Sequence, residues 1–322
     1  MLHGIRFDNF FSFREETVVS FEVTEHVRGS DLVVIREGMP RLSKVLAVIG
    51  ANGSGKTNLL KAPAFAYWFV SESFKLDPES EIPYQPHFFN LQEPSTFELI
   101  FDVEGTIYRY ELTIVRKRVL REALYHKTSS QFSTLFVRTW NGESYEIKQR
   151  GFGMGVKQAR NVRENASLIS TAAQHSVPLA VKLLSRPRFS SNLQETGRLR
   201  SSAGHLFEAA ERYEQLPHLK ARMVDLLRRW DFGLVDVEIR KEKLFNDKGE
   251  EEILDVPFGV HQSASQRAEI SMFQESSGTQ GAFVLLARLL PVLEAGGLAV
   301  IDEMEADLHP HMLGQVIKLF LN

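Results

Sequence analysis

The chain has 322 residues, of which 43% are hydrophobic and 25% are charged, and its formal net charge is −3. This composition is ordinary for a globular protein, and the small net charge excludes an overall attraction to nucleic acid or membranes. The absence of cysteine excludes disulfides, thiolate metal sites and a cysteine nucleophile. Because neither a signal peptide nor an apolar run of roughly 18 residues is present, we expect a cytoplasmic protein without membrane contact.

Short strands are predicted to lead into a glycine-rich loop. Strand-favouring residues indicate strands at 2–10 and at 17–23, where the alternation is imperfect, and the apolar run 32–35 indicates another short strand. The apolar run 45–49 predicts a buried strand, the loop 50–57 follows it, and a helix is predicted from about Asn58. The loop reads Gly-Ala-Asn-Gly-Ser-Gly-Lys-Thr, so a strand and a helix flank the spacing typical of a phosphate-binding loop.

This loop predicts a site for a nucleotide and a divalent cation. Its glycines let the amides point at phosphate oxygens, and the helix N-terminus adds partial positive charge. Lys56 would contact the β- and γ-phosphates, and the Thr57 hydroxyl would ligate Mg²⁺. The expected cofactors are ATP and Mg²⁺, since no Asn-Lys-x-Asp motif for guanine is present. The alternative is a glycine-rich turn in which Lys-Thr occurs by chance. The expected nucleotide-binding residues of the loop are Asn52, Gly53, Ser54, Gly55, Lys56, Thr57 and Asn58.

The middle of the chain predicts two insertions into one nucleotide-binding domain. A proline-rich loop at 75–95 precedes a run of alternating strands, which we expect to form an antiparallel sheet, and helical periodicity follows. No repeat and no linker is apparent, so we expect a single domain over 1–322. Its expected parts are a core of 1–74 and 262–322, an antiparallel β lobe of 96–149 and a helical insertion of 155–235.

The second half of the predicted site lies far along the chain, at Asp302 and Glu303, which follow the apolar run 298–301. A buried strand that ends in Asp beside a phosphate loop places the carboxylate on Mg²⁺. The Glu that follows can act as general base on a water molecule. We therefore expect Thr57 and Asp302 to be metal residues and Glu303 to be catalytic. Taken alone, the pattern is equally typical of a strand that meets solvent.

A third motif, Glu-Ser-Ser-Gly-Thr-Gln at 275–280, precedes an apolar helix pattern. Ser277, Gly278 and Gln280 at a helix start would form an anion-binding site. We expect them to bind the γ-phosphate held by a second subunit, because the motif lies too far from the loop of its own chain. The alternative is a plain helix cap, for which Ser and Gly are favoured residues.

The three motifs, in this order, resemble the ABC-type ATPase heads of the SMC, RecF and OLD kind. The chain is similar in particular to prokaryotic single-chain ATP-binding proteins that include RloA-like and abortive-infection ATPases. The resemblance implies an α/β fold with a P-loop ABC-ATPase head, an antiparallel β lobe and a helical insertion. It also implies an ATP sandwich homodimer, or a higher oligomer built from dimers, and a role in phage defence. The stretches that carry the resemblance are 10–13, 50–58, 97–101, 108–110, 275–280 and 301–310.

The chain departs from the family pattern at several positions. Thr279 replaces the second glycine of the signature, Asp307 stands where the family usually has Ser, and Gln92 is a weak candidate for the Q-loop. The family also continues with a strand and a switch histidine. We therefore expect either a longer native protein or impaired hydrolysis.

Three functions follow from these motifs. The first expectation is an ATP-driven switch that controls a separate effector such as a nuclease or toxin. The second is a RecF-like DNA-binding ATPase in DNA repair, for which basic clusters at 116–121 and 186–200 are candidate phosphate contacts. The third is an ATP-bound scaffold that sequesters a toxin. The basic clusters are also typical of solvated faces between acidic neighbours.

Overall fold

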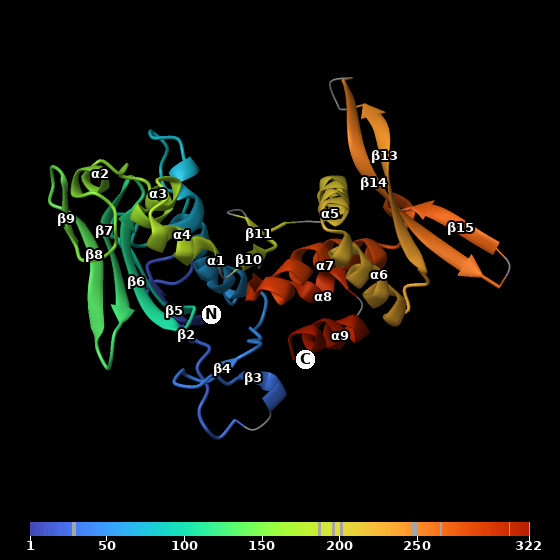
Figure 1. Ribbon diagram of the computed structural model, residues 1–322, viewed down its shortest axis with the longest axis horizontal. Coiled ribbons are helices and arrows are strands. Elements are labelled where there is room, and N and C mark those ends of the chain that lie inside the picture. Colours follow the sequence, from blue (N-terminus) through green and yellow to red (C-terminus); the bar gives the residue numbers. More distant parts are fainter. Residues whose placement is uncertain are drawn as a thin grey trace. The chain divides into compact units, whose positions relative to one another are not determined.

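The computed structural model describes residues 1–27, 30–185, 188–194, 197–199, 202–245, 250–264, 266–308 and 310–321. The chain divides into two compact units (Figure 1). The first unit comprises Met1–Gly197, Gly296–Asp302 and Leu321, and the second comprises Arg198–Ala295 and Glu303–Phe320. The helical range predicted at 155–235 is therefore shared between the two units.

A seven-stranded antiparallel sheet is the framework of the first unit. Its pairing confirms the antiparallel strands predicted within 96–149. In one central strand Tyr110, Leu112 and Ile114 are buried and alternate with half-buried residues, as expected for a strand with one face on a core. In spatial order the strands are β2 (Thr17–Ser20), β1 (Leu2–Asp8), β5 (Ser95–Val103), β6 (Thr106–Val115), β7 (Arg118–Lys127), β8 (Phe132–Trp140) and β9 (Tyr145–Gln149).

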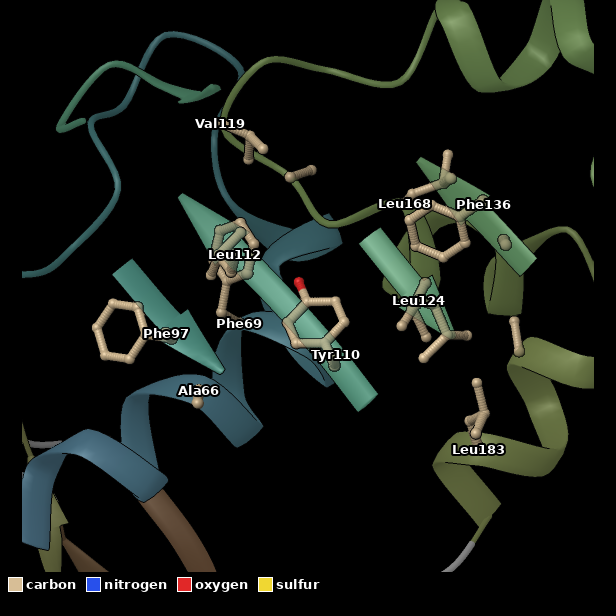
Figure 2. Close-up of a cluster of buried hydrophobic side chains, with 14 of the residues drawn as sticks. Ala66, Phe69, Phe97, Tyr110, Leu112, Val119, Leu124, Phe136, Leu168 and Leu183 are labelled. Carbon is tan, nitrogen blue, oxygen red and sulfur yellow. The ribbon is translucent and has the colours of Figure 1, made fainter. Parts of the chain in front are cut away.

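Four helices pack against this sheet through apolar side chains. Figure 2 shows Ala66 and Phe69 of the first helix, and Leu183 of the fourth, among the sheet residues Tyr110 and Leu124. This shared core holds the first helix, and with it the glycine-rich loop at its start, against the sheet. The helices are α1 (Lys56–Glu72), α2 (Val156–Arg160), α3 (Leu168–Gln174) and α4 (Pro178–Ser185), and the 3-10 turn η2 (Ser73–Lys75) follows α1.

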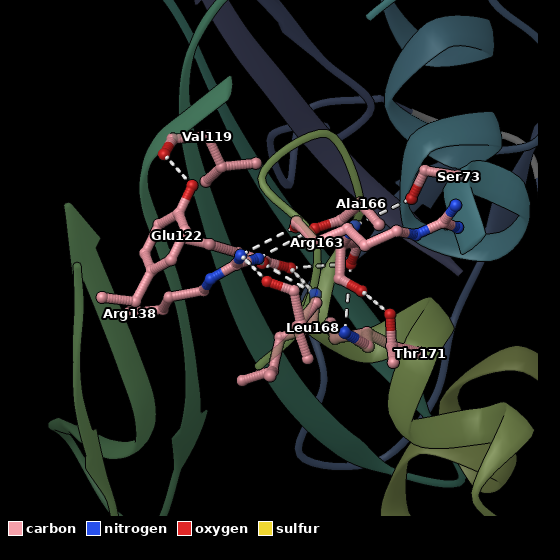
Figure 3. A network of polar contacts seen from close by, with 12 residues as sticks. Ser73, Val119, Glu122, Arg138, Arg163, Ala166, Leu168 and Thr171 are labelled. Carbon is pink, nitrogen blue, oxygen red and sulfur yellow. Dashed lines mark hydrogen bonds and ion pairs between the residues drawn. The ribbon is translucent and has the colours of Figure 1, made fainter. Parts of the chain in front are cut away.

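A buried ion pair ties the helices to the sheet (Figure 3). Arg138 on β8 and Glu122 on β7 are both fully buried, and Nη1 lies 3.7 Å from Oε2. Glu122 accepts hydrogen bonds from Ser167 Oγ at 2.7 Å and from the Leu168 backbone N–H at 2.8 Å, where α3 begins. Burial raises the pKa of Glu122, and the charge of Arg138 opposes that shift. Arg138 itself donates to the carbonyl oxygens of Val162, Arg163 and Ala166.

The prediction of a buried strand at 45–49 is wrong. These residues form no strand, and Leu46 and Ile49 are 44% and 92% exposed. An apolar run becomes a strand only where a neighbour pairs with its backbone, and no described residue pairs with this one. The other apolar run, β16 (Gly297–Val300), pairs in parallel with β10 (Arg188–Ser191).

The remaining short elements of the first unit differ in length from the prediction. The strand predicted at 17–23 ends at Ser20, and the one predicted at 32–35 is reduced to two residues. The other short elements of this unit are η1 (Ser30–Leu32), β3 (Val33–Val34), β4 (Leu42–Ser43) and β11 (Leu193–Gln194). In β12 (Gly197–Arg198), Gly197 belongs to the first unit and Arg198 to the second.

The second unit combines helices with a three-stranded antiparallel sheet. Tyr213 donates to the Phe283 carbonyl oxygen at 3.0 Å, which joins two of the helices through a buried contact. No helix in the described part of the chain is both long and apolar enough to cross a bilayer. The elements are α5 (Ala203–Gln215), α6 (Pro217–Arg229), β13 (Asp236–Phe245), β14 (Glu251–Ser263), β15 (Gln266–Ser271), η3 (Met272–Gln274), α7 (Ser277–Ala295), α8 (Met304–Asp307) and α9 (Pro310–Leu321).

Replacing Arg138 by Met is expected to lower the free energy of unfolding by about 3–5 kcal/mol, because Glu122 is left charged and buried. Urea denaturation measures this loss. The double variant Arg138→Met with Glu122→Gln should lose less than the sum of the two single losses, since the unpaired charge is then absent. A loss below about 1 kcal/mol for Arg138→Met would contradict this role of the pair.

Candidate functional site

The glycine-rich loop has backbone angles that require glycine. Gly53 and Gly55 have φ values of 78° and 93°, in the left-handed region. At Gly50 a Cβ would lie 2.6 Å from Ser54 Oγ, so a side chain there would force the Ser54 hydroxyl to move away. The Ser54 N–H donates to the Ala51 carbonyl oxygen at 3.2 Å, which closes the turn. The loop is therefore curled and leads directly into α1.

Lys56 reaches back across this loop. Its Nζ donates to the Gly50 carbonyl oxygen at 2.8 Å and to the Ala51 carbonyl oxygen at 2.9 Å. Helix α1 begins at Lys56, after Gly55, and carries no side-chain cap hydrogen bond. The loop thus brings together a cation and the open N–H groups of a 17-residue helix, both of which favour an anion.

Thr57 and Asp302, which the sequence predicts as the metal pair, lie in contact. Thr57 Oγ1 donates to Asp302 Oδ2 at 2.7 Å, and Asp302 is only 4% exposed. The Asp302 backbone is held by Asn192: its N–H donates to Asn192 Oδ1 at 2.8 Å, and its carbonyl oxygen accepts from Asn192 Nδ2 at 2.9 Å. Sequence reasoning missed Asn192, which lies in a polar stretch without periodicity.

Lys61 is a second cation that sequence reasoning missed. It lies four residues after Thr57, on the same face of α1, and is 9% exposed. Its Nζ lies 4.0 Å from the ring centroid of Phe11. Burial lowers the pKa of Lys61, and the nearby charge of Asp302 opposes that shift. A buried cation thus lies within electrostatic range of the carboxylate that the sequence assigns to Mg²⁺.

The turn at 10–13 packs against the start of α1. Ser12 Oγ accepts from Asn58 Nδ2 at 3.0 Å, and a Cβ on Gly55 would lie 3.0 Å from the same oxygen. Phe11 adopts a left-handed φ of 48°, which is strained for an aromatic residue. Asn58, expected to contact nucleotide, therefore also anchors this turn to the loop.

Glu303 belongs to the second unit and is the N-cap residue of the short helix α8. Its φ is 47°, in the left-handed region that non-glycine residues rarely adopt. Its side chain is 56% exposed, and Oε2 lies 3.5 Å from Nη1 of Arg198. Arg198 is a partner of Glu303 that the sequence did not reveal.

The signature residues lie at the N-terminus of α7, in the second unit. Ser276 caps this helix, because its Oγ accepts from the Thr279 N–H at 3.1 Å. Ser277 is exposed, and a Cβ on Gly278 would lie 3.8 Å from Ser276 Oγ with no closer neighbour. The Gln280 amide instead donates into its own loop, to the carbonyl oxygen of residue 275 at 2.9 Å and that of residue 273 at 3.3 Å. Ser277 is thus open to solvent and Gly278 is half-buried, whereas the Gln280 side chain is bonded to the backbone of its own turn.

The oxygen ligands at this site suit Mg²⁺ bound together with a nucleotide better than a metal ion held by protein side chains alone. No cluster of three or more His, Cys, Asp or Glu side chains able to hold a metal occurs among the described residues. Mg²⁺ is usually held by one or two carboxylates, a hydroxyl and substrate phosphates, which matches Asp302 and Thr57 beside a curled loop. The residues present therefore fit the expected cofactors.

The fold and this site define the class of protein: a mixed α/β chain with a large antiparallel sheet, consistent with an AAA-type ATPase domain. The family model described as "AAA domain, putative AbiEii toxin, Type IV TA system" matches residues 45–322. The chain belongs to this family, which confirms the predicted kinship with prokaryotic ATPases of abortive-infection systems. No curated protein matches the chain.

Replacing Gly55 by Ala is expected to weaken ATP binding at least tenfold, because a Cβ at φ 93° would press on Ser12 and distort the loop. Gly105→Ala is the matched control: Gly105 has a φ of 79° and open space around it. Both variants should lose about 1–3 kcal/mol of stability from backbone strain. Equilibrium binding of a fluorescent ATP analogue separates them, and equal affinities for the two variants would contradict the role of Gly55.

Proposed function

We propose that the chain binds ATP with Mg²⁺ at the loop 50–57 and at Asp302, and hydrolyses it slowly. The observation that carries this proposal is the 2.7 Å hydrogen bond between Thr57 Oγ1 and Asp302 Oδ2. It joins two motifs that are 245 residues apart and that have a common purpose only in nucleotide binding. The two basic groups near this pair, Lys56 and Lys61, would offset phosphate charge.

Each residue of the proposed site has a separate task. Lys56 and the N–H groups of residues 52–58 hold the phosphates, and Thr57 and Asp302 hold Mg²⁺. Mg²⁺, when bound, supplies charge that offsets the negative charge developing during phosphoryl transfer. Glu303 follows Asp302 directly, and its carboxylate is proposed to accept a proton from the attacking water. The ion pair with Arg198 would orient that carboxylate.

We further propose a homodimer, or a larger oligomer built from dimers, in which Ser277 and Gly278 bind the γ-phosphate of the second subunit. The support is their place at the start of a 19-residue helix, where Ser277 is exposed, Gly278 is half-buried, and Ser276 supplies the cap. The amides there and the helix dipole favour an anion. In this proposal the nucleotide-binding core is formed by 1–74 and 262–322.

The proposed biological role is an ATP-controlled switch on a separate effector, such as a toxin or nuclease, in defence against phage. It is supported by the family description, which names a toxin and a toxin–antitoxin system. A RecF-like DNA-binding ATPase is the alternative, and its affinity for DNA would fall steeply with salt. Of the arginines in the second basic cluster, Arg186 and Arg200 lie outside the described residues, and Arg198 pairs with Glu303. An ATP-bound scaffold that sequesters a toxin would show binding without turnover.

Lys56→Ala is expected to weaken ATP binding by about 10–100-fold, because the phosphates lose a charge-assisted hydrogen bond. Isothermal titration with ATP and Mg²⁺ measures the change. Lys75→Ala is the control, since Lys75 is 73% exposed just beyond the other end of α1 and forms an ion pair with Glu72, far from the loop. An affinity within twofold of wild type for Lys56→Ala would rule out the phosphate assignment.

Glu303→Gln keeps the shape of the side chain and removes its basicity. We expect it to bind ATP normally, to hydrolyse ATP about 10²–10⁴-fold more slowly, and to accumulate as an ATP-bound dimer. Phosphate release and light scattering with ATP are the two measurements, and Glu305→Gln, another exposed residue of the same turn, is the control. Hydrolysis at the wild-type rate would exclude Glu303 as the base. If the wild type hydrolyses ATP as slowly as Glu303→Gln, the ATP-bound scaffold would be favoured.

A further inference from the structure

Asn192 is a buried polar residue that no motif explains. It follows the last residue of β10 and is 7% exposed. The parallel pairing of β10 with β16 ends at Ser191 and Val300, so neither strand continues to Asn192 or Asp302. Beyond this point the Asn192 side chain, and not a strand, makes the hydrogen bonds to the Asp302 backbone.

Both polar atoms of the Asn192 amide are used on one residue. Oδ1 accepts the Asp302 N–H at 2.8 Å, and Nδ2 donates to the Asp302 carbonyl oxygen at 2.9 Å. A side-chain amide carries one acceptor and two donors, so it can pair with a peptide as a neighbouring strand would. Asn192 therefore restrains the backbone on both sides of the Asp302 side chain.

This restraint acts where the chain would otherwise be free to turn. Asp302 has no ladder partner, and the next residue, Glu303, already has a left-handed φ of 47°. The Asp302 carboxylate nevertheless lies 2.7 Å from Thr57 Oγ1. Small errors in the position of a ligand reduce metal affinity strongly, because Mg²⁺ demands a near-ideal octahedral geometry.

We infer that Asn192 is a positioning residue for Mg²⁺: it holds the Asp302 backbone so that the carboxylate and the Thr57 hydroxyl meet the same ion. This inference rests on the proposed function of Asp302. Asn192 touches neither nucleotide nor metal in this account. Its effect is therefore confined to the gain in ATP affinity that Mg²⁺ provides, and affinity for ATP without metal is unaffected.

The test compares equilibrium binding of a fluorescent, non-hydrolysable ATP analogue in Mg²⁺ and in EDTA. Asn192→Leu keeps the volume of the side chain and removes both hydrogen bonds. In this variant the dissociation constant in EDTA divided by that in Mg²⁺ should be at least tenfold smaller than in the wild type. The dissociation constant in EDTA should stay within twofold of wild type. The amide of Asp302 should also exchange its hydrogen faster in the metal-free protein.

Asn165→Leu is the matched control. Asn165 is 2% exposed in the same unit and donates to the carbonyl oxygens of Asp77 at 2.8 Å and Ser80 at 2.9 Å. Its loss should lower the melting temperature and leave the effect of Mg²⁺ unchanged. Asn192→Ser is the milder variant, with one hydroxyl for two partners, and it decides the question if Asn192→Leu does not fold.

Three outcomes would overturn the inference. The first is a wild-type effect of Mg²⁺ in a folded Asn192 variant, while Asp302→Asn abolishes that effect; the proposed function would then stand. The second is failure of both Asn192 variants to fold while Asn165→Leu folds, which would indicate a role in folding alone. The third is an undiminished effect of Mg²⁺ in Asp302→Asn, which would refute the metal assignment of the proposed function itself.

Discussion

The contact between Thr57 and Asp302 is the interaction on which the account of this protein depends. Burying a carboxylate is costly unless it has hydrogen-bond donors or an opposite charge nearby. Asp302 has the Thr57 hydroxyl at 2.7 Å and the charge of Lys61 within electrostatic range. The same two groups extend from the first two turns of α1, directly after the glycine-rich loop. The loop, the helix and the end of β16 are therefore coupled through one carboxylate.

The rest of the first unit keeps this arrangement in place. The antiparallel sheet and the helices packed on it hold α1 through an apolar core, and the Glu122–Arg138 pair secures the start of α3. At the start of α1, the strained turn at Phe11 and the hydrogen bond from Asn58 to Ser12 anchor the glycine-rich loop. Strain of this kind persists only where the surroundings impose it, and it often accompanies functional sites.

Sequence patterns predicted the parts whose chemistry is carried by spacing. The loop 50–57, the pair Asp302–Glu303 and the helix start at Ser277 were all recognisable, and the antiparallel strands within 96–149 followed from alternation. The strand at 45–49 was predicted wrongly, because an apolar run does not reveal whether a neighbour pairs with it. Asn192 could not be found either: its role comes from a backbone contact with a residue 110 positions away.

In the second unit, too, the sequence did not reveal which partners two polar residues contact. Arg198 belonged to a cluster that the sequence allowed to contact DNA, yet its guanidinium lies 3.5 Å from the Glu303 carboxylate. Gln280 was expected to bind nucleotide, and its amide is bonded to the backbone of its own turn. In both cases the residue type predicted an interaction with charge or phosphate, and the fold decided which partner was nearer.

The metal site formed by Thr57 and Asp302 can be tested by a crystal structure with a non-hydrolysable ATP analogue and Mn²⁺ in place of Mg²⁺, because Mn²⁺ can be located by its anomalous scattering. We expect one Mn²⁺ between Thr57 Oγ1 and the Asp302 carboxylate, with the β- and γ-phosphates inside the loop and Lys56 Nζ moved from the loop carbonyls to the phosphates. A nucleotide bound elsewhere, or a metal ion that does not contact Asp302, would contradict it.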